Sequence, residues 1–261
     1  MEFIAYIVAG AAVGFAVGVT GVGGGSLMTP ILMLFGFQPH VAVGTDLLYA
    51  AITKTGGVLA HRQRSTVRWD IVAFLSLGSI PASLATIYAL YRYFPDANAY
   101  SHLLSSMLGV MLILTSVVLL FRKRIISGSL QENPFTLLSH LQSRSKVYTW
   151  VMGIVLGVMV TLSSVGAGAF GAAVLLMLYP RLATIKVVGT DIAHAVPLTL
   201  VAGMGHLLLG NVNYVLLGSL LIGSLPAIYL GTQLATRLPE KLLQSVLASM
   251  LLFMGVKYAF F

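Results

Sequence analysis

Three charged residues lie within otherwise apolar stretches of the sequence: Asp46, Lys54 and Asp191. An ionisable side chain at membrane depth costs at least about 2.5–3.5 kcal/mol and usually marks a substrate or proton pathway. Lys54 is ten residues into an apolar stretch that begins near residue 44, which places it about 15 Å into a hydrocarbon core of about 30 Å. We therefore expect its ammonium group to attract an anion. Pairing with an aspartate, or snorkelling to an interface, is the alternative role for this lysine.

Two glycine-rich strings could supply a second source of positive potential. Residues 20–26 read Thr-Gly-Val-Gly-Gly-Gly-Ser and precede an apolar stretch, and residues 163–168 read Ser-Ser-Val-Gly-Ala-Gly. Glycines allow a helix to break in mid-membrane, and the next helix then presents free N–H groups and a positive dipole to an anion. Close packing of helices through small residues is the alternative. The substrate-binding candidates here are Gly23, Gly24, Gly25, Ser26, Gly166 and Gly168.

A Gly-Thr-Asp motif occurs twice, at 44–46 and at 189–191. Thr45 and Thr190 could donate hydroxyl hydrogen bonds to a substrate. Asp46 and Asp191 are expected at the starts of helices, where a carboxylate stabilises the positive end of the dipole. Coupling to a proton or another cation is the alternative role for both aspartates, and His194, which corresponds to Tyr49 in the first motif, is a further coupling candidate.

The two motifs belong to a longer internal repeat. At the same offset of 145 residues, His61 corresponds to His206 and Pro81 to Pro226, while the glycine strings correspond at an offset of 143. The paired prolines are expected to kink equivalent helices, and the paired histidines lie near helix ends, where a structural role is expected. Corresponding Gly- and Pro-interrupted segments in two halves are typical of transporters whose site lies between repeats.

Composition limits the class of protein. Hydrophobic residues make up 58% of the 261 residues and charged residues only 8%, about a third of the charged share of a soluble domain. The net charge of +8 comes from Lys and Arg between the apolar stretches, as the positive-inside rule predicts, so no nucleic-acid partner is expected. Cysteine is absent, and with no hydrolase or metalloprotease motif we expect neither an enzyme nor a metal or other cofactor.

The apolar stretches predict an all-α polytopic membrane protein with five segments in each half. The first two segments of each half are short or broken by glycine and each pair resembles a helical hairpin; whether these hairpins cross the membrane or are re-entrant is left open. The predicted organisation is a first repeat at 1–121, a basic cytoplasmic linker at 122–147 and a second repeat at 148–261. The ten segments are 3–19, 26–36, 44–61, 70–93, 103–121, 148–162, 168–179, 187–209, 213–234 and 242–260.

The distribution of basic residues predicts that the two halves have opposite orientations. The loop at 62–69 carries three arginines, whereas its counterpart at 210–212 has no basic residue. The loop at 180–186 carries Arg181 and Lys186, whereas its counterpart at 36–43 has none. The bias reverses between equivalent loops, and an odd number of segments in each half also requires inversion. Both termini are then expected on the external side.

The same residues carry a resemblance to a known family. The strings at 21–30 (Gly-Val-Gly-Gly-Gly-Ser-Leu-Met-Thr-Pro), 43–54 and 56–62 resemble those of the sulfite exporter TauE/SafE family, also called the 4-toluene sulfonate uptake permease family. The resemblance extends over nearly the whole chain and implies an inner-membrane carrier with two inverted repeats. It also implies small sulfur-containing anions as substrates, such as sulfite and organosulfonates. The second half departs from the glycine-rich pattern at Ser163, Ser164 and Ala167, so the two half-sites are expected to differ.

Residues and resemblance together predict a secondary transporter, an exporter of small sulfur-containing anions that works by alternating access. Lys54 and the helix N-termini would bind the anion, and Asp46, Asp191 or His194 could couple its movement to protons. The alternative is a passive anion channel or facilitator that uses the same residues. The expected location is the cytoplasmic (inner) membrane, with the lipid bilayer and an inorganic or organosulfur anion as partners. The sequence leaves open whether copies of the chain form a homo-oligomer.

Overall fold

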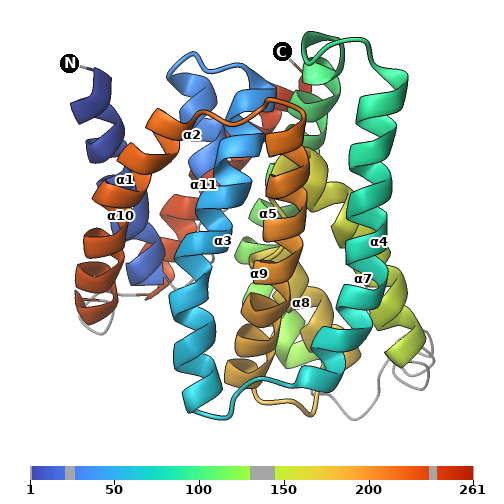
Figure 1. The fold of residues 1–261 in the computed structure, drawn as a ribbon. Coiled ribbons are helices and arrows are strands. Elements are labelled where there is room, and N and C mark those ends of the chain that lie inside the picture. The colour runs from blue at the N-terminus through green and yellow to red at the C-terminus, as the bar shows by residue number, and fades with distance from the viewer. Residues whose placement is uncertain (1, 21–26, 130–144, 235–239, 261) are drawn as a thin grey trace.

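The computed structural model describes residues 2–20, 27–129, 145–234 and 240–260, and every regular element in these ranges is helical. The predicted all-α class is therefore confirmed, and each predicted segment corresponds to one helix (Figure 1). The largest shift is at the end of α5, which extends eight residues beyond the predicted segment, and α3 begins five residues earlier than expected. The helices are α1 (Glu2–Thr20), α2 (Met28–Leu34), α3 (Pro39–Gln63), α4 (Trp69–Tyr93), the 3₁₀ turn η2 (Asn98–Tyr100), α5 (Ser101–Ser129), α7 (Ser145–Ser163), α8 (Ala169–Leu178), α9 (Thr184–Leu208), α10 (Tyr214–Leu234) and α11 (Glu240–Phe260).

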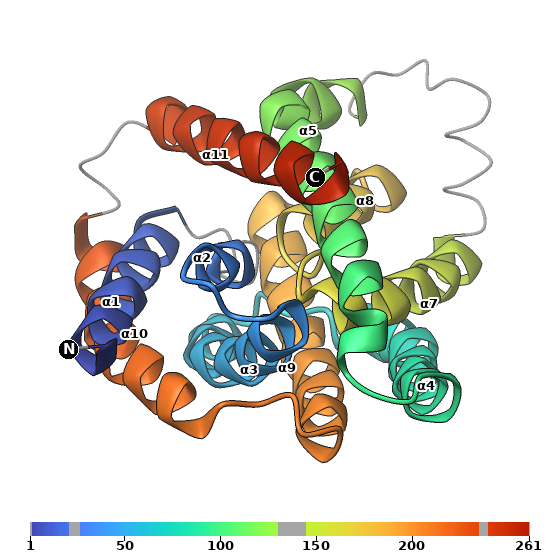
Figure 2. The same cartoon turned by 90° about the horizontal axis from the view of Figure 1, so that it is seen from above.

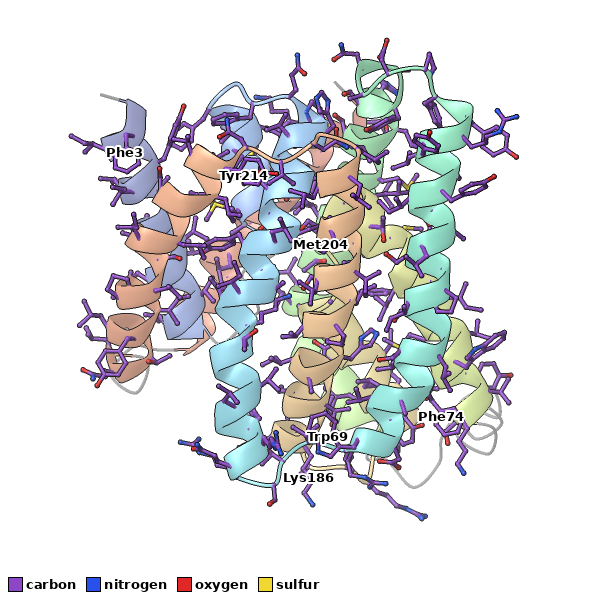
Figure 3. All side chains as sticks on the ribbon, in the orientation of Figure 1. Phe3, Trp69, Phe74, Lys186, Met204 and Tyr214 are labelled. Atoms are coloured by element: carbon purple, nitrogen blue, oxygen red, sulfur yellow. The ribbon has the colours of Figure 1, made fainter. Side chains whose placement is uncertain are left out.

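The surface of the helix bundle is suited to lipid. Five of the described helical segments are long and apolar enough to cross a membrane: α4, residues 98–121, α7, α9 and α10. Large apolar side chains such as Leu77 and Tyr229 point outward along them. Figure 3 places Phe3 and Tyr214 toward one end of the bundle, and Trp69 with Lys186 at the other. Aromatic residues at both ends are typical of the two membrane–water interfaces.

Helices from the two halves pack in matching pairs. α1 packs against α10, and the equivalent helices α7 and α4 pack against each other. α3 packs against its own equivalent α9, and α5 against its own equivalent α11. Figure 2 shows the α1–α10 and α4–α7 pairs on opposite sides of α3 and α9, with α5 and α11 along a third side. This exchange of partners supports two repeats related by a pseudo-twofold axis between α3 and α9.

The close approach within the outer pairs depends on equivalent glycines. A Cβ atom at Gly223 would overlap the carbonyl of Ile7 and lie 2.9 Å from the amide nitrogen of Ala11. A Cβ atom at Gly78 would overlap the carbonyl of Trp150 and lie 2.9 Å from the amide nitrogen of Ile154. Small residues let membrane helices pack backbone to backbone, where dispersion replaces the missing hydrophobic drive. The repeat is thus present in the packing as well as in the sequence.

The two helical hairpins fold back within the bundle, which supports the re-entrant alternative. α2 has 7 residues and α8 has 10, so they extend only about 10 and 15 Å, less than the hydrocarbon core. Near the start of α1, the ring of Tyr6 lies 5.4 Å from that of Phe37, which follows α2. Near the start of α7, Thr149 shares a 2.8 Å hydrogen bond with Tyr179, which follows α8. Each hairpin therefore brings its end back beside its start.

Candidate substrate pathway between the two halves

α3 and α9 form the centre of the molecule and run antiparallel, as two reciprocal hydrogen bonds show. The amide of Asn213, just after α9, donates to the Thr45 hydroxyl at 3.2 Å. The amide of Arg68, just after α3, donates to the Thr190 hydroxyl at 3.0 Å. Asn213 and Arg68 are themselves repeat equivalents, so each Gly-Thr-Asp threonine holds the loop that follows the other repeat's helix. Both threonines are buried in this role, and direct substrate binding by them stays a prediction.

The paired histidines have the structural role that was expected of them. His61 shares a 2.8 Å hydrogen bond with Thr66, in the turn after α3. His206 contacts the equivalent residue Asn211 at 3.0 Å, in the turn after α9, and its other ring nitrogen lies 2.9 Å from the Thr161 carbonyl. These bonds secure the helix ends, away from the centre of the bundle.

Lys54 lies almost on the pseudo-twofold axis. A Cβ atom at Gly57 would lie 3.6 Å from Ile192 on α9. This antiparallel register places Ile52 level with Pro197, its own repeat equivalent. Lys54 is two residues further along α3, and its equivalent is the uncharged Thr199. The cation therefore occupies the centre of a nearly symmetric structure but is present only once.

The Lys54 side chain points into the protein, because only 7% of the residue is exposed. Its ammonium group donates a 3.0 Å hydrogen bond to the carbonyl of Ala167, between α7 and α8. Ala167 is 113 residues away in the sequence, so this contact joins the first repeat to the break in the second. Lys54 therefore lies in the protein interior, whereas anion binding by its ammonium group stays a prediction.

The break between α7 and α8 runs alongside the charged residues. Ser164 lies near the Asp46 carboxylate, Ala167 contacts Lys54, and a Cβ atom at Gly171, in the first turn of α8, would overlap Asp191. The segment leaves the helical conformation at Ser164, Gly166 and Gly168, whose φ angles are 58°, 125° and 148°. Only glycine adopts the last two without strain. Non-helical backbone at membrane depth occurs where it is buried in protein or lines a cavity, which makes this segment part of the candidate pathway.

Asp46 binds the start of the first re-entrant helix. Its Oδ2 accepts hydrogen bonds from the amide of Thr29 at 3.2 Å and from the Thr29 hydroxyl at 2.5 Å. Thr29 is in the first turn of α2, where a carboxylate is stabilised by the helix dipole. The expectation that Asp46 begins its own helix is wrong, because α3 starts at Pro39. The capping role is real, but the capped helix is a different one.

Asp191 has the equivalent position but not the equivalent bonds. It is seven residues into α9, so it too fails to start its own helix. It lies against the first turn of α8, yet its buried Oδ1 has no hydrogen-bond partner among the described residues. Three residues later, His194 shares a 2.8 Å hydrogen bond with Ser79 on α4 through Nε2, while its buried Nδ1 has none there. Lys54 interacts electrostatically with both Asp191 and His194.

Some residues of the site were not predicted from the sequence, and some predicted residues lie outside the described ranges. Gly23, Gly24, Gly25 and Ser26 are outside the described ranges, so their part in the site stays a prediction. Thr29, Ser79 and the Ala167 carbonyl were not anticipated. Ser79 belongs to a Gly-Ser pair that recurs in the second half as Gly223-Ser224, and this recurrence was a signal for a polar role. A backbone carbonyl leaves no signal in the sequence. Within the described ranges, no group of acidic or histidine side chains is arranged to hold a metal.

A surface depression of about 400 Å³ lies at the far end of α9. It includes Asn213, whose amide binds Thr45, but not Lys54 or either aspartate. The central charges do not line it. Its lining residues are Val41, Gly210, Val212, Asn213, Tyr214 and Val215.

Comparison with known proteins identifies the family of this chain. The family model for the sulfite exporter TauE/SafE matches residues 6–258. The chain belongs to the TauE/SafE family. The predicted family resemblance is thus confirmed over nearly the whole length, and the protein is a multi-pass transporter of the cytoplasmic (inner) membrane.

Relatives of this TauE/SafE chain are named as transporters too. It is 35% identical to the probable membrane transporter protein YjnA of Bacillus subtilis (strain 168), over 97% of this chain and 98% of the relative. It is 26% identical to the probable membrane transporter protein YdhB of the same organism, over 78% of each chain. It is 25% identical to the probable membrane transporter protein YunE, over 82% of each chain. No solved structure matches the chain.

Proposed function

We propose that this TauE/SafE protein is a secondary transporter that exports small sulfur-containing anions, such as sulfite or organosulfonates, by alternating access. The observation that carries this proposal is the single buried ammonium group of Lys54, which lies where α3 crosses α9 and contacts the break between α7 and α8. The family supplies the sulfur chemistry of the substrate, and the site supplies the positive charge.

The physical basis is the cost of burying a charge. A cation in the apolar interior is unfavourable unless a charged or polar partner compensates it. In this conformation a carbonyl oxygen accepts one of the three ammonium protons of Lys54, and a carbonyl carries only a partial charge. An oxyanion presents several full-strength acceptors and would satisfy the ammonium group better. Lys54 is thus suited to exchange the Ala167 carbonyl for a substrate oxygen.

The pseudo-twofold arrangement of the helices supports the alternating-access part of this proposal. Inverted repeats can exchange conformations about a central site, so that the site opens first to one side and then to the other. Lys54 lies within about two residues of the level at which α3 meets its equivalent in α9. A binding group at this position remains central while the two halves exchange roles.

The test is uptake of radiolabelled sulfite, thiosulfate, sulfate, methanesulfonate and sulfoacetate into liposomes that contain the purified protein. We expect Lys54→Ala to reduce flux of the transported anion to the level of empty liposomes. Lys186→Ala is the matched control, because it removes a lysine from the end of the bundle, and it should transport like the unmodified protein. Full flux in Lys54→Ala would refute the role of the ammonium group.

The same liposomes distinguish a transporter from a passive anion channel. A transporter should show saturable exchange and should accumulate its substrate against a gradient, whereas a channel only equilibrates it. Equilibration without accumulation under every imposed ion gradient would favour the channel. Recovery of the anion in chemically altered form, without net flux, would instead indicate an enzyme.

A further inference from the structure

We propose that Asp191 carries a proton that moves together with the anion, whereas Asp46 remains ionised as a structural cap. This inference rests on the proposed transport function and adds its coupling mechanism to it. Sequence alone presented the two aspartates as equivalent members of a repeat. The structure gives them different surroundings.

The first argument is the charge of the site. Asp46, Lys54 and Asp191 interact electrostatically in the buried centre of the bundle. With both carboxylates ionised and the ammonium group protonated, they carry a formal charge of −1. Entry of a monoanion would make the formal charge of the site −2. In a medium of low dielectric constant, like charges repel strongly. One carboxylate must therefore take up a proton for the anion to bind favourably beside Lys54.

The second argument identifies which carboxylate is protonated. Asp46 accepts two hydrogen bonds from Thr29 at the positive end of α2, and both favour the ionised form. Oδ1 of each aspartate is buried without a hydrogen-bond partner among the described residues, so the difference between the two carboxylates lies in the Thr29 bonds to Oδ2 of Asp46. The α8 amides at this point are already used, because Gly171 and Ala172 donate to the carbonyls of Gly166 and Gly168. Protonation of the carboxylate therefore costs less free energy at Asp191 than at Asp46.

The third argument is distance from the cation. In the register of α3 and α9, Lys54 is about four residues, or about 6 Å along the axis, from the level of Asp191. Asp46 is eight residues from Lys54, about 12 Å. The interaction of Lys54 with Asp191 is accordingly the larger of the two. A substrate anion at Lys54 would compete with Asp191 for the ammonium group, which ties anion binding to protonation of this carboxylate.

The other groups around Asp191 leave it as the proton site. α3 contributes Lys54, and α9 itself contributes His194, which faces Lys54. The described parts of α4, α7 and α8 that pack against α9 bring no further charged group that interacts with Asp191. Arg68 adjoins Thr190 through its backbone, but its guanidinium group is exposed and paired with Asp70.

Co-transport has a definite consequence for energetics. The proton enters from the same side as the anion, resides on an Asp191 oxygen during the crossing and leaves on the other side with the anion. For a monoanion the cycle is electroneutral. For a dianion such as sulfite, one net negative charge moves with each cycle, so an inside-negative membrane potential favours export while an outside-acid pH gradient opposes it.

The experiment measures accumulation in liposomes with the membrane potential clamped by potassium and valinomycin. A pH gradient of one unit, acid outside, is imposed, and thiosulfate, sulfate and methanesulfonate serve as probes because they do not titrate near neutral pH. One co-transported proton should give about tenfold accumulation, with acidification of an internal pH dye. Asp191→Asn and Asp191→Ser should accumulate nothing, while downhill flux remains measurable. Asp96→Asn is the matched control, because it neutralises an exposed carboxylate in the turn between α4 and α5, and it should still accumulate about tenfold.

A second readout needs no variant. Dicyclohexylcarbodiimide reacts with protonated carboxyl groups in apolar surroundings, so peptide mapping of the labelled unmodified protein should find the reagent on Asp191. Labelling at Asp46, or at neither aspartate, would overturn the assignment, as would tenfold accumulation by either Asp191 variant.

The outcomes separate this inference from the proposed function. Flux of a probe without proton movement in the unmodified protein would overturn co-transport and leave the transport function standing. Absence of flux for all five anions of the uptake panel would refute the proposed function, and the coupling inference would fall with it.

Discussion

Substitution of Gly223 by alanine tests the packing on which the central site depends. Gly223 is on α10 at its contact with α1, and an added Cβ atom would overlap the Ile7 carbonyl and approach the Ala11 amide nitrogen to 2.9 Å. Ordinary contacts begin near 3.4 Å, and both atoms belong to backbone that cannot rotate away. The two helices must therefore separate.

The size of the effect follows from that separation. A shift of about 0.5–1 Å forfeits a quarter to a half of the dispersion energy of each contact along the interface, and overpacking of this kind typically costs about 1–3 kcal/mol. We place Gly223→Ala at the upper end, about 3 kcal/mol, because the obstructing atoms are backbone. Gly78→Ala should cost a similar amount, since it meets equivalent atoms on α7.

The assay is unfolding in mixed micelles with increasing SDS, followed by tryptophan fluorescence. Gly218→Ala is the matched control, because it lies on the same helix and an added Cβ atom meets nothing within 4 Å. It should keep full stability, or gain up to about 1 kcal/mol from helix propensity. Equal stability of Gly223→Ala and Gly218→Ala would refute the close approach of α1 and α10. A large loss of stability in Gly223→Ala without a similar loss in Gly78→Ala would contradict the equivalence of the α1–α10 and α4–α7 helix pairs.

Two further predictions concern the helix ends. Thr45→Val and Thr190→Val each remove one buried hydrogen bond to a loop amide, so each should lower the free energy of unfolding by about 1 kcal/mol; a loss in only one of them, in the same SDS titration, would argue against reciprocal roles. Asn211→Ala removes the amide that contacts both His206 and Tyr100 and should cost about 2 kcal/mol; unchanged stability would show that this network contributes nothing.

Much of the fold could be predicted because its signals are local. A run of apolar residues bounded by charges or glycine determines where a membrane helix lies, since every backbone polar group must be satisfied within the segment. The observed helices therefore follow the predicted segments closely, as with the predicted 70–93 and the observed Trp69–Tyr93. The repeated Gly-Thr-Asp motif and the burial of Lys54 were likewise anticipated from residue type and spacing.

The errors concern relations between segments that are distant in the sequence. Asp46 was expected to start its own helix, but α3 continues for seven residues before it. The carboxylate caps α2 instead, because the re-entrant hairpin brings Thr29 beside it. Spacing along one helix cannot show which other helix end lies against a side chain.

By itself the sequence determined that this protein is helical, crosses the membrane and is built from two related halves, because apolar length and motif recurrence are properties of the linear chain. It also indicated one uncompensated charge, at Lys54. Only the tertiary structure decided how the two aspartates differ, since that depends on which donors reach each carboxylate. Thr29, in the first turn of α2, donates to Asp46, whereas the first turn of α8, at 169–172, has no hydroxyl or other donor side chain to offer Asp191.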